Sequence, residues 1–143
     1  MHFQTTIFAA ALMAATSVYA APTTAAAIPN WTLTSVNRAC DSANDKCVWT
    51  FGINTNTGAA ATPCTFAITG ANASEGNLTT PILCGAFKVT AGWSGQFGPG
   101  NGFTTLSVFD TANSQIAWPA YTDKQLANGA VVKPDMSWAV TQM

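Results

Sequence analysis

Side chains that could act as nucleophiles or as general acids and bases are scarce in this sequence of 143 residues. The single histidine, His2, lies in an N-terminal stretch that has the character of an export signal. A mature chain without that stretch has no imidazole. Ser-His-Asp and Cys-His nucleophile pairs, histidine-dependent ribonucleases and histidine-ligated metal centres are therefore excluded.

The acidic residues give little support to an alternative chemistry. Two carboxylates could in principle serve a glycosidase, but each acid lies in a polar turn or loop, where carboxylates usually face solvent or cap a turn. We therefore predict a protein that is not an enzyme, with no catalytic residue and no cofactor. The acids are Asp41, Asp45, Glu75, Asp110, Asp123 and Asp135.

The four cysteines of this short, exported chain predict two disulfides, for which three connectivities exist. If Trp31–Ala39 pairs antiparallel with Cys47–Ile53, Cys40 faces Cys47 at the base of a turn. If Cys64–Thr69 pairs with a strand around Leu83–Val89, Cys64 can face Cys84.

We predict the pairing Cys40–Cys47 with Cys64–Cys84 from this strand register alone. The alternative pairing, Cys40–Cys84 with Cys47–Cys64, closes loops of similar entropic worth. A zinc site is disfavoured, because no two cysteines have the Cys-x2–4-Cys spacing and an oxidising compartment favours disulfides. No metal is expected.

The aromatic residues are the better candidates for function. Trp93 and Phe97 lie beside a glycine-rich stretch, Gly98–Gly102, and Trp118 precedes a proline. Core packing with a hydrogen-bonded indole N–H is the simpler interpretation of both tryptophans. The alternative is that Trp93, Phe97 and Trp118 are exposed and stack on a sugar or on a partner protein. The glycines do not form a phosphate-binding loop, because a strand follows them where a helix would be needed.

Three Asn-x-Ser/Thr sequons predict N-glycosylation, at Asn30, Asn72 and Asn77. The last two fall in one polar segment, 70–81, which we expect to be a surface loop.

The domain organisation follows from the N-terminus. The apolar run Ile7–Ala15 is too short to span a bilayer, and Val18-Tyr-Ala20 supplies the small residues of a cleavage site. We predict a signal peptide over residues 1–20 and a single secreted, extracellular domain over 21–143.

Charged residues make up only 8% of the chain and the net charge is −1. Nucleic acid is a poor partner for such a chain, and no segment suits membrane insertion.

Short alternating segments separated by turns predict the fold class. Cys47–Ile53, Cys64–Thr69, Ile82–Val89 and Phe103–Phe109 each have the pattern of a strand. Thr122–Gly129 has the punctuation of a two-turn helix, with Thr122 or Asp123 as its cap. We predict an all-β protein, a compact antiparallel sandwich or barrel with at most one short helix.

Several motifs resemble a family of small secreted fungal proteins known as surface proteins or hypersensitive response-inducing elicitors. The resemblance is carried by Trp93–Val108, Trp118–Leu126 and Val132–Asp135, with Arg38–Cys40 and Cys47–Phe51 upstream. It implies an extracellular β-rich protein that plant cells sense. The cerato-platanins share the size and the four cysteines but not the tyrosine- and aspartate-rich N-terminal signature.

Two classes of function follow. In the first, the protein is an elicitor or effector that a plant cell-surface receptor recognises through its folded surface, inducing a hypersensitive or defence response. In the second, it is a cell-wall module that binds a glycan through exposed Trp93 or Trp118. The first is the expectation that the resemblance favours.

Overall fold

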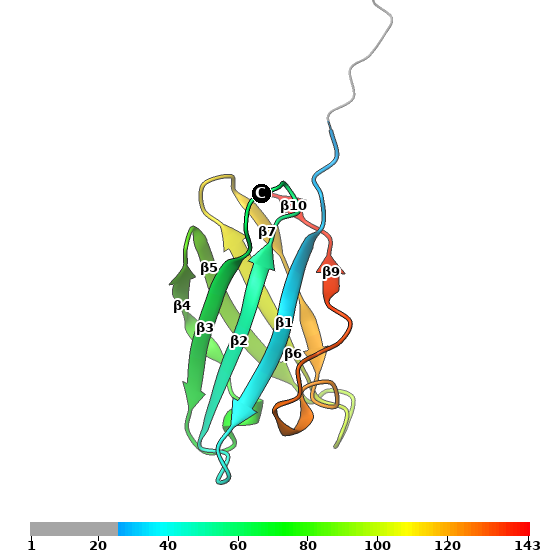
Figure 1. Cartoon of the computed structure of the whole chain (residues 1–143). Coiled ribbons are helices and arrows are strands. Elements are labelled where there is room, and N and C mark those ends of the chain that lie inside the picture. The colour runs from blue at the N-terminus through cyan, green and yellow to red at the C-terminus, as the bar shows by residue number, and fades with distance from the viewer. Residues whose placement is uncertain (1–25) are drawn as a thin grey trace, which may run out of the picture.

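The computed structural model describes residues 26–143, which form a sandwich of two antiparallel sheets (Figure 1). The predicted all-β fold is therefore confirmed, and the sandwich rather than the barrel is observed. The predicted signal peptide lies outside the described residues. Within residues 26–143, no helix has the length and apolar character needed to cross a membrane.

The first sheet has four strands in the order β3-β2-β1-β9. Their bounds are Trp31–Cys40 for β1, Lys46–Asn54 for β2, Thr62–Thr69 for β3 and Met136–Trp138 for β9.

The second sheet has six strands, five of them in the order β10-β7-β6-β5-β4, with β8 also pairing with β6. Their bounds are Leu78–Cys84 for β4, Phe87–Ser94 for β5, Phe103–Asp110 for β6, Gln115–Ala117 for β7, Ala120–Thr122 for β8 and Thr141–Gln142 for β10. Two 3₁₀ turns complete the structure, η1 at Ala73–Glu75 and η2 at Ala127–Gly129. The predicted helix over Thr122–Gly129 is therefore a series of turns that ends in η2.

Strand alternation builds the core between the sheets. On β2 every second side chain is buried, starting at Cys47 and including Trp49, as the sequence predicts. From the opposite sheet, β5 buries Val89 while β6 buries Leu106 and Val108. Removing these side chains from water is the main source of the fold's stability.

A bulge in β1 changes which of its side chains face the core. Trp31 and Leu33 point inward, but the register shifts between Thr34 and Asn37, and inward positions then become Val36 and Arg38. Ser35, at the bulge, has φ of 49°. Its backbone N–H donates to Asp135 Oδ1 at 2.9 Å.

Both predicted disulfides are confirmed, though one for the wrong reason. Cys40 and Cys47 are cross-strand partners at the end of the β1–β2 hairpin, as predicted. Cys64 and Cys84 are also bonded, but β3 and β4 are not paired in one sheet. Because β3 and β4 are edge strands of different sheets, this disulfide joins the two layers.

The single strand predicted over Ile82–Val89 is wrong. Cys84 pairs with Phe87, so the chain reverses between them and forms the β4–β5 hairpin. Gly85 has φ of 60°, a conformation that glycine adopts without the steric cost of a side chain.

The last two strands belong to different sheets. β9 pairs with β1, where Trp138 faces Trp31, and β10 pairs with β7, where Thr141 faces Ile116. The chain therefore passes from one layer of the sandwich to the other within a few residues.

Candidate functional site

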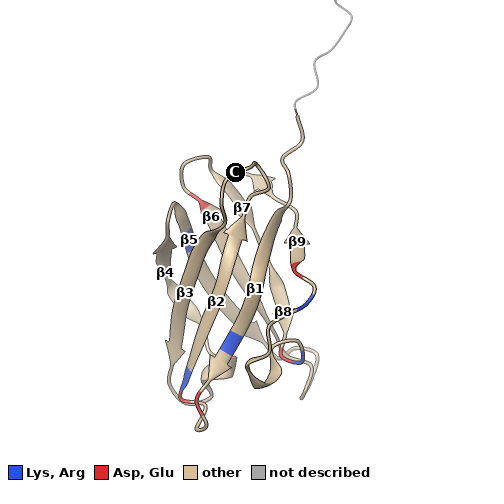
Figure 2. Ribbon diagram, in the orientation of Figure 1, with Lys and Arg blue, Asp and Glu red and all other residues tan. Residues whose placement is uncertain are grey.

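One end of the sandwich collects four turn segments and most of the charged residues of the described part of the chain. We call it the loop end and define it by segments 41–46, 70–77, 95–102 and 123–130, together with Arg38. Figure 2 shows charged positions gathered at this end, whereas the strands above it are largely uncharged. The charged residues of the loop end are Arg38, Asp41, Asp45, Lys46, Glu75, Asp123 and Lys124.

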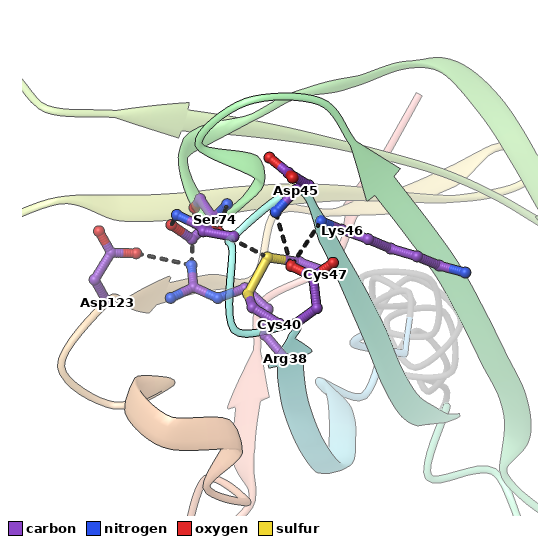
Figure 3. Close-up of a disulfide and its surroundings, with 9 residues drawn as sticks. Arg38, Cys40, Asp45, Lys46, Cys47, Ser74 and Asp123 are labelled. Carbon is purple, nitrogen blue, oxygen red and sulfur yellow. Dashed lines mark hydrogen bonds and ion pairs between the residues drawn. A yellow bond between two sulfur atoms is a disulfide. The ribbon is translucent and has the colours of Figure 1, made fainter.

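A chain of polar contacts centred on Asp123 holds the loop end together. Arg38 Nη1 donates to Asp123 Oδ1 at 2.9 Å, and Trp93 Nε1 donates to Asp123 Oδ2 at 2.9 Å. Arg38 Nη1 also donates to the carbonyl oxygen of Ser74 at 3.0 Å (Figure 3). Asp123 thus joins β1 of one sheet to β5 of the other.

Arg38 carries its charge in a site that water hardly reaches. The residue is 6% exposed, its guanidinium lies 5.9 Å from the centre of the Trp49 ring, and its Nε has no hydrogen-bond partner among the described residues. A buried cation is stable only when an opposite charge and hydrogen bonds replace its hydration. Asp123 supplies that charge.

The glycine-rich loop is wrapped around the Trp93 indole. A Cβ atom at Gly95 would lie 2.5 Å from Trp93 Cη2, and one at Gly102 would lie 2.6 Å from Cζ2. The same atom at Gly102 would lie 2.5 Å from Asp123 Oδ2. Glycine is therefore required at both positions by close packing, and the Trp93 ring determines the shape of the loop.

Phe97 lies at the tip of this loop and is 66% exposed. Its ring stacks on Phe103, with 5.7 Å between centroids and 29° between planes. The two rings line a shallow, mainly apolar cleft of about 260 Å³, which is completed by Asn101, Ala120, Tyr121 and Thr122. This cleft offers a contact surface for an apolar group.

A second hollow, of about 470 Å³, lies under the loop. It is lined by Glu75, Trp93 and Asp123 and by the loop residues Gly95, Gly98, Pro99, Gly100 and Gly102. One edge of Trp93 thus remains accessible although the residue is half-buried.

The structure separates the three aromatic residues that the sequence singled out. Trp93 has the inward phase of β5 and its N–H is hydrogen-bonded. Trp118 is 48% exposed between buried Ala117 and Pro119, so its side chain points away from the core. Phe97 and Trp118 are the strongly exposed members.

Tyr121 is the one buried phenol of the described residues, at 1% exposure. Burial raises its pKa to about 12, with a further increase from the charge of Asp135. The hydrogen bond that Trp138 Nε1 donates to its oxygen at 3.2 Å opposes this effect. Tyr121 is therefore neutral at physiological pH and serves packing.

Most carboxylates have structural partners. Asp41 Oδ1 accepts from the backbone of Asp45, Asp110 Oδ1 accepts from that of Ala112, and Asp135 accepts at the β1 bulge. Within residues 26–143, no group of three or more His, Cys, Asp or Glu side chains could hold a metal ion. The arrangement presents a shaped surface and does not concentrate reactive groups.

The asparagines of all three sequons are exposed. Asn77 Oδ1 accepts from the backbone N–H of Trp93 at 2.8 Å, which leaves Nδ2, the atom that carries an N-linked glycan, outside that contact. Asn72 adopts a left-handed backbone conformation before η1.

Sequence reasoning missed Arg38 and the role of Asp123. Arg38 faces inward only because the bulge at Ser35 shifts the alternation of β1, and nothing in the residue pattern marks that bulge. Asp123 has the sequence signature of a cap, but its carboxylate is used in the ion pair. Phe103, Thr105, Ser107 and Phe109 occupy alternate positions of one strand, and this pattern could have predicted an aromatic surface on the outside of the sheet.

Comparison with known proteins places the chain among effectors. The model of the Effector TSP1 family matches residues 32–143. A protein of Hypocrea virens (strain Gv29-8 / FGSC 10586) described as Effector TSP1 is 48% identical over 136 residues, and the match covers 91% of each chain.

Proposed function

Because this chain belongs to the Effector TSP1 family, we propose that it is a secreted fungal effector that plant cells sense through its folded surface, with a hypersensitive or defence response as the outcome. Export is supported by the apolar N-terminal run and by two disulfides, which persist in oxidising compartments. A receptor at the plant cell surface is the partner we propose.

We further propose that the protein acts by binding and not by catalysis. Its sequence has no histidine after His2, and four of its six carboxylates are held in turns, in the β1 bulge or in the ion pair with Arg38. If the protein does not catalyse a reaction, its effect on plant cells must come from binding to a partner.

The observation that carries the proposal is the presentation of Phe97. An exposed aromatic ring lies at the tip of a loop that Trp93 and Asp123 brace from below. A contact residue held in this way loses little conformational freedom on binding. Exposed aromatic anchors often contribute about 2 kcal/mol to the free energy of binding, which corresponds to roughly 30-fold in affinity.

The test is to infiltrate leaves with purified protein and to measure ion leakage and the oxidative burst. We expect the native protein to elicit a response, the reduced and alkylated protein to be inactive, and Phe97→Ala to need a roughly 30-fold higher dose. Leu83→Ala is the matched control, because Leu83 is 70% exposed on an edge strand. Thermal melts establish that the variants are folded.

Two results would contradict the proposal. Full activity of the reduced and alkylated protein would mean that a linear segment is sensed. Undiminished activity of folded Phe97→Ala would remove the loop tip from the recognition surface.

A further inference from the structure

The outer face of the six-stranded sheet carries a row of aromatic side chains that the loop end does not explain. On β6 the inward residues Thr104, Leu106 and Val108 are buried, whereas Phe103 and Phe109 alternate with them and are half-buried on the outside. Two aromatic rings on the solvent side of a strand are not needed for the core.

Trp118 falls on the same face, between these two phenylalanines. Val108 pairs with Ala117 and Thr105 pairs with Ala120, so Trp118 lies beside Ser107. With Phe97 stacked on Phe103, the aromatic row runs in the order Phe97, Phe103, Trp118 and Phe109. At about 3.4 Å per residue, the distance along β6 from Phe103 to Phe109 is roughly 20 Å.

The residues between the rings are small and carry hydroxyl groups. On β6 these residues are Thr105 and Ser107. Their partners on the neighbouring strand β5 are Gly92 and Thr90, respectively. Gly92 leaves open space, since a Cβ there would have Asn77 Oδ1 as its nearest neighbour at 3.9 Å. Between the aromatic rings, the outer face of β5 and β6 therefore presents small side chains with hydrogen-bonding hydroxyl groups.

Charge decides what kind of ligand suits this face. Lys88, which pairs with Phe109, is the one charged residue at the outer positions of paired β5 and β6. A polyanion would need several cations, and an acidic or basic peptide would need opposite charges. A neutral ligand with flat apolar faces and hydroxyl edges matches aromatic rings interleaved with hydroxyl groups.

We propose that the aromatic row is a binding platform for a neutral, extended β-linked polysaccharide. The C–H faces of successive pyranose rings would stack on Phe103, Trp118 and Phe109, while ring hydroxyls would bond to Thr105 and Ser107. A row of roughly 20 Å accommodates several consecutive sugars. Phe97 belongs both to this row and to the loop end, but the three proposed sugar contacts, Phe103, Trp118 and Phe109, lie outside the loop end, so the two proposals can be tested separately.

The test is sedimentation of the purified protein with insoluble chitin, cellulose and β-1,3-glucan, and calorimetric titration with the matching soluble hexasaccharides. We expect binding to at least one polysaccharide. Trp118→Ala should weaken it at least tenfold, whereas Trp118→Phe, which keeps a stacking ring, should stay within a few-fold of the parent. Val131→Ala, also a loss of an exposed apolar side chain but next to Val132, which bonds to β1 of the other sheet, should bind normally.

Absence of binding by the parent protein to all three polymers and their oligosaccharides would refute the platform, as would unchanged binding by folded Trp118→Ala. Light scattering that shows a dimer dissociated by Trp118→Ala would instead assign this face to a second copy of the chain. The leaf assay with Phe97→Ala is read separately, so either proposal can fail alone.

Discussion

At the scale of single residues, Asp123 has the most consequential contacts at the loop end. Its two carboxylate oxygens satisfy a buried guanidinium and an indole N–H from strands of opposite sheets. A neutral amide at this position could accept a hydrogen bond but could not balance the charge of Arg38.

Asp123→Asn should therefore lower the free energy of unfolding by about 2 kcal/mol, since breaking a partly buried ion pair leaves its partner uncompensated. The expected loss of stability is modest because the Asp123 side chain is 28% exposed, so water screens part of the ion pair. Urea denaturation measures the effect. Asp45→Asn, at an exposed turn residue, should change stability by less than about 0.5 kcal/mol. Equal effects of the two substitutions would refute the role of Asp123.

Tyr121 gives the protein a stability limit at high pH. Its pKa is about 12 in the folded chain, against an ordinary value of 10.0 for a tyrosine in an unfolded one. Below pH 10 the phenol keeps its proton in both the folded and the unfolded chain, so its titration does not lower the free energy of unfolding. Between pH 10 and 12 only the unfolded state releases it, so the free energy of unfolding should fall, by roughly 2 kcal/mol at pH 12. Denaturation across this range should show a fall in the parent that is absent from Tyr121→Phe; parallel curves would contradict the prediction.

At the scale of elements, the glycine-rich loop has its shape because Trp93 occupies the space beside Gly95 and Gly102. Two of its other glycines, Gly98 and Gly100, have positive φ and make the turns at the tip. The loop is thus packed at its base and turned at its tip, which holds Phe97 outward.

Gly102→Ala should destabilise the protein by about 2 kcal/mol, because the new methyl group overlaps both Trp93 and Asp123. Gly92→Ala is the matched control, since its methyl group would enter open space on β5 and its expected effect is slightly stabilising. Thermal denaturation of both variants gives the comparison. A Gly102→Ala protein as stable as Gly92→Ala would show that the loop base is loosely packed.

The elements differ in how far the sequence predicts them. The β1–β2 hairpin and its disulfide follow from strict alternation starting at Cys47 and a polar turn. The β4–β5 reversal was missed because Gly85 interrupts an otherwise continuous apolar pattern by a single residue. Such a two-residue turn depends on backbone conformation and not on hydrophobic period.

The candidate site was predictable only in part. Phe97 and Trp118 stand out as large aromatics beside turn residues, and the structure exposes both. The contact between Arg38 and Asp123 joins residues 85 positions apart and depends on an unmarked bulge. Local pattern contains no information about such a pairing.

At the scale of the whole molecule, the two sheets are held together by the core and by one covalent link. Cys64–Cys84 ties edge strand β3 to edge strand β4, whereas Cys40–Cys47 staples two strands that already share a ladder.

Removing the disulfide between the sheets should cost more than removing the hairpin staple. With sequence separations of 20 and 7, loop-closure entropy gives about 3.3 and about 2.4 kcal/mol for Cys64–Cys84 and Cys40–Cys47. Denaturation of Cys64→Ala/Cys84→Ala and of Cys40→Ala/Cys47→Ala provides the comparison. A larger loss in the second double variant would mean that the link between the layers adds little to native packing.

The crossing of the chain between β9 and β10 bears on how the protein can be made. Each sheet receives its final strand from residues 136–142. In the β1–β9 pair, Thr32 faces Ser137, which lies 105 residues further along the chain. A nascent chain on the ribosome therefore cannot complete either layer until this late segment has emerged. Trp31 and Leu33 therefore stay without their β9 partners until Met136 and Trp138 have been synthesised, so this sheet depends on contacts between residues that are far apart in the sequence.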